Sequence, residues 1–144
     1  MMWRYVLLLA ISMLHIGVAE AHNRSQSFSS WTIDDRHLQM LYTIPAREVT
    51  RLKKSEVTSL EVLLISNLSE YIKVKQDSVI CPLAADEKFQ SVPSKPAYLR
   101  ISAVFQCPYD LQAAPPTLVI GSFFEHLSSH VHYAQVRRQG KVPL

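Results

Sequence analysis

Hydrophobic and polar residues alternate along the segment HLQMLYTI, residues 37–44. Its apolar positions share one face: Leu38, Met40, Tyr42 and Ile44. The other face carries His37, Gln39 and Thr43, as in a strand with one solvated side. The preceding segment FSSWTI, residues 28–33, also has a strand-like composition, and two aspartates separate it from the next. The pattern predicts a β-hairpin that Pro45 ends.

The period of the pattern changes to that of a helix in residues 58–71, where leucines recur at three- and four-residue intervals. Thr58 and Glu61 form a capping-box pattern just before the apolar run. We therefore expect one amphipathic helix over about residues 59–71, packed on a sheet. The segment REVTRL ahead of it, residues 47–52, is expected to form a short helical turn.

Strand-like segments dominate the rest of the chain, apart from a polar loop with two prolines at 84–96. The expected strands cover residues 71–77, 78–83, 97–107, 115–124 and 129–138. The first two could pair around Gln76 and Asp77. The whole pattern predicts an α+β, mostly β, fold, with a sandwich-like antiparallel sheet and one amphipathic helix packed on it.

The first 21 residues have the layout of a secretory signal peptide. Arg4 precedes a short apolar run, and the sequence AEA at 19–21 is a small-x-small cleavage pattern. The alternative is an uncleaved anchor, but the apolar run is shorter than a membrane span requires. Residues 22–144 are then expected to form a single extracytoplasmic β-rich domain.

Charge and glycine content argue against two classes of function. The net charge is +3, and the basic residues are scattered rather than gathered in a stripe, which gives no sign of nucleic-acid binding. Only three glycines occur, so the chain has no glycine-rich loop of the kind that cradles phosphate.

The chain has two cysteines, Cys81 and Cys107. In an oxidising compartment an even number of cysteines favours a disulfide, and neither residue belongs to a C-x-x-C pair. The alternative is a pair of soft metal ligands. The signal peptide favours the disulfide because it directs the chain to an oxidising compartment.

Histidines give the chain a candidate metal site. His130 and His132 stand two residues apart in an expected strand, so their side chains share one face. Cleavage after residue 21 would make His22 the first residue, where its amine and ring could bind Ni(II) or Cu(II) together. We therefore take His22, His130 and His132 as candidate metal ligands. The alternative is that the paired histidines belong to the core or are satisfied by neighbouring groups.

The sequence carries no recognisable catalytic motif. It contains neither a G-x-S-x-G elbow nor an H-E-x-x-H helix. Glu125, His126 and Ser128 are close in sequence but cannot be assembled into a triad from their order alone. We expect no enzymatic activity.

Three segments resemble the N-terminal extracytoplasmic region of HupE/UreJ-type bacterial membrane proteins: AHNRSQSFSSW, PAREVTRL and FFEHLSSHVHYAQVR. In that family a signal peptide and a β-rich domain precede a multi-helix membrane domain related to nickel permeases. This chain has no such membrane helices, so the resemblance implies a truncated or split member. It implies a location in the periplasm or on the outer face of the cytoplasmic membrane.

The resemblance favours a non-catalytic accessory or sensing domain of a HupE/UreJ-like metal-transport protein, with a divalent transition metal as a candidate ligand. The competing interpretations are a structural module that docks on a membrane partner, or a truncated gene product without function. The predicted last strand has no return strand after Gln139-Gly140, so we expect an exposed sheet edge there.

Overall fold

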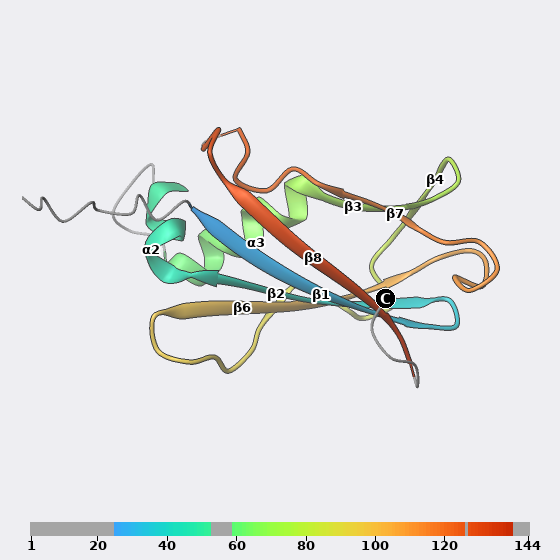
Figure 1. Cartoon of the computed structure of the whole chain (residues 1–144). Coiled ribbons are helices and arrows are strands. Elements are labelled where there is room, and N and C mark those ends of the chain that lie inside the picture. Colours follow the sequence, from blue (N-terminus) through green and yellow to red (C-terminus); the bar gives the residue numbers. More distant parts are fainter. Residues whose placement is uncertain (1–24, 53–58, 126, 140–144) are drawn as a thin grey trace, which may run out of the picture.

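The computed structural model describes residues 25–52, 59–125 and 127–139. These residues form two β-sheets and one long helix, with two short helical segments between β2 and that helix (Figure 1). The predicted α+β, mostly β, fold is confirmed.

The larger sheet, sheet A, has five strands in the order β5-β6-β2-β1-β8. Their bounds are β1 Gln26–Asp34, β2 His37–Pro45, β5 Gln90–Ser91, β6 Tyr98–Gln106 and β8 Val131–Arg138. The predicted hairpin is present, because β1 pairs antiparallel with β2 up to Asp34 opposite His37. Strand β8 differs from the expected antiparallel arrangement, since it pairs parallel to β1.

The smaller sheet, sheet B, has the order β4-β3-β7. Its strands are β3 Ile72–Gln76, β4 Val79–Cys81 and β7 Thr117–Ile120. As predicted, β3 and β4 pair around the Gln76-Asp77 turn, where Asp77 has a φ of 53°. An aspartate tolerates this left-handed conformation better than most residues do.

Two short helical segments, α2 Ala46–Val49 and η1 Thr50–Leu52, follow β2 where a helical turn was expected. The long helix α3 spans Leu60–Tyr71 and leads directly into β3. Its N-cap is Ser59, whose hydroxyl accepts a hydrogen bond from the Val62 amide at 3.3 Å. The predicted capping box at Thr58 and Glu61 is therefore wrong by one residue. No helix among the described residues is long and apolar enough to cross a membrane.

The predicted loop at 84–96 contains a strand that the sequence pattern did not reveal. Gln90 and Ser91 form β5 by pairing with Ser102 and Ile101 of β6. Both β5 residues are exposed, so no alternation of apolar side chains marks the strand.

The core lies between the inner face of sheet A, helix α3 and sheet B. Its largest fully buried side chains include Trp31 and Tyr42 from sheet A, Leu64 and Leu68 from α3, and Phe123. Figure 1 shows α3 behind β1 and β8, where it covers this inner face. The amphipathic helix predicted from the leucine spacing thus packs on the sheet.

The predicted disulfide is present. Cys81 at the end of β4 is bonded to Cys107, which directly follows β6, and their Cα atoms are 4.6 Å apart. Both cysteines are 2% exposed. The bond joins a strand of sheet B to the end of a strand of sheet A.

Candidate functional site

Serine and histidine side chains meet where β1 and β8 run side by side. The register places Ser27 opposite His132 and Ser29 opposite Ala134. Because successive side chains of a strand point to opposite faces, Ser25, Ser27 and Ser29, which are two residues apart, all reach the inner face of sheet A. The side chains of His130 and His132 reach the same face from the neighbouring segment. The sequence SQSFS of residues 25–29 supplies the serines, and HVH of residues 130–132 supplies the imidazoles.

The five side chains form one continuous ladder of hydrogen bonds. His130 contacts the Ser25 hydroxyl through Nδ1 and the Ser27 hydroxyl through Nε2, each at 2.7 Å. His132 contacts the same Ser27 hydroxyl through Nδ1 at 2.6 Å and the Ser29 hydroxyl through Nε2 at 2.8 Å. All four imidazole nitrogens therefore have a serine partner, and Ser27 is shared by both rings. We call these five residues the serine–histidine ladder.

The hydrogen bond from Trp31 gives the direction in which the side chains of the ladder donate their hydrogen bonds. The indole N–H of Trp31, which can only donate, donates to the Ser29 hydroxyl at 2.7 Å. Ser29 can then donate to His132 Nε2, and His132 Nδ1 can donate to Ser27. Continuing in the same sense, Ser27 donates to His130 Nε2. This order satisfies each ring with one donated and one accepted hydrogen bond, which requires both imidazoles to be neutral.

Aromatic rings enclose both histidines. The His132 ring stacks on Tyr42 with centroids 5.2 Å apart and planes 9° apart. The His130 ring stacks on Phe123 at 5.2 Å and meets the edge of Phe124 at 5.6 Å. His130 is only 4% exposed. The rings are thus held in an apolar pocket, with hydrogen bonds supplied by the serines alone.

Burial sets the protonation of both histidines. Desolvation, followed by the neighbouring His130, lowers the pKa of His132 to about 4. Desolvation also lowers the pKa of His130, while the charge of Glu48 opposes this shift and that of Arg51 adds to it. Both changes favour the neutral rings that the ladder requires.

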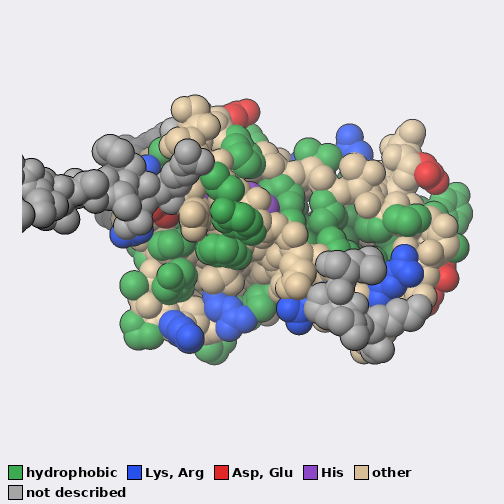
Figure 2. Space-filling model, viewed as in Figure 1, with side chains coloured by type: hydrophobic (Ala, Val, Ile, Leu, Met, Phe, Trp, Pro, Cys, Tyr) green, Lys and Arg blue, Asp and Glu red, His purple; other side chains and the backbone are tan. Residues whose placement is uncertain are grey.

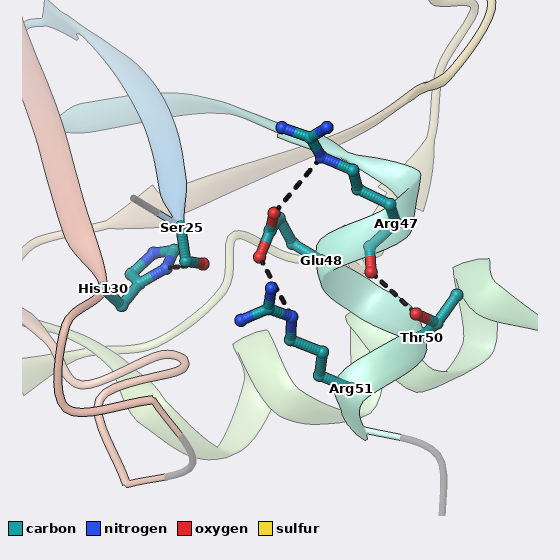
Figure 3. A network of polar contacts seen from close by, with 6 residues as sticks. All are labelled: Ser25, Arg47, Glu48, Thr50, Arg51 and His130. Atoms are coloured by element: carbon teal, nitrogen blue, oxygen red, sulfur yellow. Dashed lines mark hydrogen bonds and ion pairs between the residues drawn. The ribbon is translucent and has the colours of Figure 1, made fainter. Parts of the chain in front are cut away.

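Glu48 is the buried carboxylate near the ladder, with a side chain only 3% exposed (Figure 3). Arg47 Nε lies 3.4 Å from its Oε1, and Arg51 Nε lies 3.5 Å from its Oε2. Oε2 accepts no hydrogen bond from the described residues, so we take the Arg51 contact as a charge interaction. Figure 3 shows Glu48 between the two arginines, with Ser25 and His130 nearby, directly before the strands β1 and β8.

The candidate metal ligands are brought together only in part. His130 and His132 do share one face, as predicted, but His22 and the nearby His126 lie outside the described residues. Among the residues that are described, no group of three or more His, Cys, Asp or Glu side chains could hold a metal ion. A metal at the paired histidines would also have to displace serine hydroxyls. Binding of Ni(II) or Cu(II) by His22, His130 and His132 stays a prediction.

A serine within hydrogen-bonding distance of a histidine is also the beginning of a nucleophile–base pair. Ser27, however, is fully buried and is shared between two imidazoles, and neither ring has a carboxylate as a hydrogen-bond partner. Glu125 accepts a hydrogen bond from the Tyr71 hydroxyl at 2.7 Å, which raises the pKa of Tyr71 to about 12. Ser128 is exposed. The absence of enzymatic activity stays a prediction.

Sequence reasoning found the histidines of the ladder but not its serines. The expected first strand begins at residue 28, whereas β1 begins at Gln26, so the expected strand leaves out Ser25 and Ser27. The signal was a serine at every second position, S-x-S-x-S, whose period equals that of H-x-H. Only the parallel register of β1 and β8 shows that the two patterns face each other.

A comparison with models of known protein families finds no match for this chain, and a search of curated proteins finds none either.

Proposed function

We propose that this chain is a non-catalytic extracytoplasmic accessory domain that docks on a membrane-protein partner through the open edge of β8. The observation that carries the proposal is that β8 is the outermost strand of sheet A among the residues that the structure describes. An edge strand presents unpaired backbone groups to which a partner can add a strand.

The backbone groups at this edge follow from the parallel pairing. In a parallel pair, the N–H and C=O of alternate residues point toward the neighbour, and those of the residues between them point away. The Val131 amide donates to Ser25 and the Gln139 amide to Ile33, so odd-numbered residues face β1. The residues that present their backbone outward are His132, Ala134, Val136 and Arg138.

Strand β8 lacks several of the usual features that protect an edge. It is eight residues long and contains neither proline nor lysine. Its two arginines, Arg137 and Arg138, stand together at one end and leave the middle of the strand uncharged. In Figure 1 it runs along the front of the molecule beside β1. These properties fit a docking edge.

The resemblance to HupE/UreJ-type proteins suggests the partner, a nickel-permease-like membrane domain. Export through a signal peptide at residues 1–21 belongs to this proposal, although those residues are not among the described ones. The buried Cys81–Cys107 disulfide is compatible with an oxidising compartment. Metal binding is not part of the proposal, because every nitrogen of His130 and His132 already has a serine partner.

The substitution Ala134→Pro tests the proposal. Ala134→Pro removes an outward N–H without removing a hydrogen bond to β1, and Ala134→Thr is a matched control that keeps this N–H. We expect Ala134→Pro to weaken binding to a detergent-solubilised HupE/UreJ-like membrane domain at least about tenfold, because strand addition depends on main-chain hydrogen bonds at this edge. Biolayer interferometry measures the binding. Ala134→Thr should bind as the unmodified protein does.

Thermal unfolding of each variant shows whether a loss of binding comes from the blocked β8 edge or from a loss of the folded structure. Gln135→Pro, which removes an N–H that faces β1, should unfold at a clearly lower temperature than Ala134→Pro. If the unmodified protein does not bind the membrane domain, or if Ala134→Pro binds it equally well, the docking proposal is wrong.

A further inference from the structure

A row of side chains crosses the outer face of sheet A, the face opposite the serine–histidine ladder. The registers place Tyr133 of β8 beside Phe28 of β1, Phe28 beside Thr43 of β2, and Thr43 beside Arg100 of β6. The row thus runs at right angles to four strands and begins at the β8 edge.

Two adjoining hollows follow this row. The larger has a volume of about 420 Å³ and is lined by Phe28, Leu41 and Tyr133, among others. The smaller, of about 280 Å³, is lined by Lys95 and Tyr98. Both are open to solvent and share Thr43 and Arg100, so we treat them as one continuous feature, the outer trough.

The end of the outer trough near β8 is aromatic. Phe28 and Tyr133 stack with ring centroids 5.3 Å apart and planes 15° apart. They are nevertheless 42% and 51% exposed, which leaves a large apolar surface in contact with water. Figure 2 shows apolar side chains gathered over β1 and β8 on this side of the molecule. Covering such a surface with another apolar group is favourable.

The opposite end of the outer trough is cationic. Arg100 donates through Nη1 to the Pro93 carbonyl at 3.3 Å, which holds its guanidinium near the rim. Among the described residues the ion pairs all involve Glu48, so no described carboxylate neutralises Arg100 or Lys95. Figure 2 shows Lys and Arg side chains below the apolar ones, toward β6. This end is complementary to a negative charge.

We infer that the outer trough binds an extended peptide segment of the docking partner, in which an aromatic or large aliphatic residue lies three or four positions from a carboxylate. The apolar side chain covers Phe28 and Tyr133, and the carboxylate pairs with Arg100. This inference rests on the proposed docking at β8, because the outer trough opens at that edge.

The spacing follows from the sheet. Tyr133 and Arg100 are three strand spacings apart, about 14 Å at the usual distance between strands. An extended chain covers that distance in about four residues. Arginine suits the charged end because its planar guanidinium can make two parallel hydrogen bonds to one carboxylate.

Fluorescence anisotropy with a short labelled peptide tests the inference on the processed protein. The probe carries phenylalanine and glutamate about four positions apart among serines and glycines, and two control peptides replace either residue with serine or glutamine. We expect the full probe to bind about tenfold more tightly than either control, because each control lacks one of the two contacts. Added salt should weaken binding of the full probe more than that of the glutamine control.

Matched protein variants show which residues of the outer trough contact the peptide. Arg100→Gln should weaken the full probe about tenfold and abolish the difference between the glutamate and glutamine peptides. Arg36→Gln makes the same change of charge at the exposed β1–β2 turn and should have no effect. Tyr133→Ser should weaken binding, whereas Tyr109→Ser, at a residue 59% exposed outside the outer trough, should not.

The outcomes separate this inference from the docking proposal. If the membrane domain binds the unmodified protein and the Arg100→Gln variant equally, docking stands and the assignment of the outer trough is wrong. If the labelled peptide binds but the membrane domain does not, the docking proposal fails while the peptide site stands. Equal binding of all three peptides, or tighter binding of a fatty acid such as laurate than of the peptide, would overturn the inference.

Discussion

The shared hydroxyl of Ser27 explains at the scale of single residues why the two histidines can be buried together. Two neutral imidazoles separated by one hydroxyl can each donate and accept once, so no polar atom of the rings is left without a partner. A protonated imidazole donates from both nitrogens and accepts nothing, which conflicts with the hydrogen bond that one of its serines donates. Protonation therefore opposes both burial and the bonding of the ladder.

This bonding predicts that the folded domain loses stability in mild acid. The pKa of His132 is about 4 in the fold, below the ordinary value of 6.5, so the unfolded chain takes up a proton first as the pH falls. The contribution is fully present above pH 6.5 and is lost progressively down to about pH 4. It amounts to at most about 3 kcal/mol for this residue. The lowered pKa of His130 acts in the same direction.

Urea unfolding at a series of pH values between 7 and 4 measures this effect. The variant that combines His130→Gln and His132→Gln should be less stable at pH 7 and should show a flatter pH dependence. His37→Gln, at a partly exposed residue of β2 away from the ladder, is the control and should keep the slope of the unmodified protein. An identical slope in all three proteins would contradict the assignment of acid sensitivity to the ladder.

At the scale of the elements, pairing decides the role of each strand. The sequence pattern correctly predicts that residues 131–138 are extended, but a strand of this composition could lie anywhere in either sheet. Its parallel pairing with β1 makes it the edge of sheet A and directs its histidines toward the serines. The same pairing directs Tyr133 to the opposite face, beside Phe28.

The start of helix α3 gives a prediction at this scale. Because the Ser59 hydroxyl caps the Val62 amide, Ser59→Ala should lower the free energy of unfolding by about 0.5–1 kcal/mol. Ser66→Ala, at an exposed position inside the same helix, is the matched control and should be neutral or slightly stabilising because alanine favours helix. Chemical denaturation followed by circular dichroism measures both. A larger loss for Ser66→Ala would place the cap elsewhere.

For the whole molecule, the disulfide is a covalent tie between the two sheets. Cys81 belongs to sheet B and Cys107 follows the last residue of β6 in sheet A, with a sequence separation of 26 residues. The segment between them contains β5 and β6, so the bond closes the loop that carries part of the outer trough. Both sulfur-bearing residues are buried in the core.

Removal of this tie should destabilise the whole domain. The double variant Cys81→Ala, Cys107→Ala should lose about 2–4 kcal/mol of unfolding free energy, since a loop of this length is no longer closed in the unfolded chain. Denaturation in guanidinium chloride measures the loss, and mass spectrometry without reductant should show no free thiol in the exported protein. Free thiols at both cysteines in properly exported protein would contradict the bond.

The sequence by itself determined the local structure of this protein. Alternating apolar residues specify β2 and β6, a strand-like composition specifies β1, helical leucine spacing specifies α3, and the two cysteines leave a single possible pair. These properties depend on neighbours along the chain, which a pattern records directly. The pattern missed β5, because a two-residue exposed strand has no period, and it placed the helix cap one residue early.

Only the tertiary structure decided which surfaces these elements create. The serine–histidine ladder requires the parallel register of β1 and β8, and the outer trough requires the registers of four strands together. Strand pairing joins residues that are far apart along the chain, such as Ser27 and His132, which are 105 positions apart. A side-chain period of two tells which residues share a face, but not which strand lies beside them, because that choice depends on how the whole core is packed.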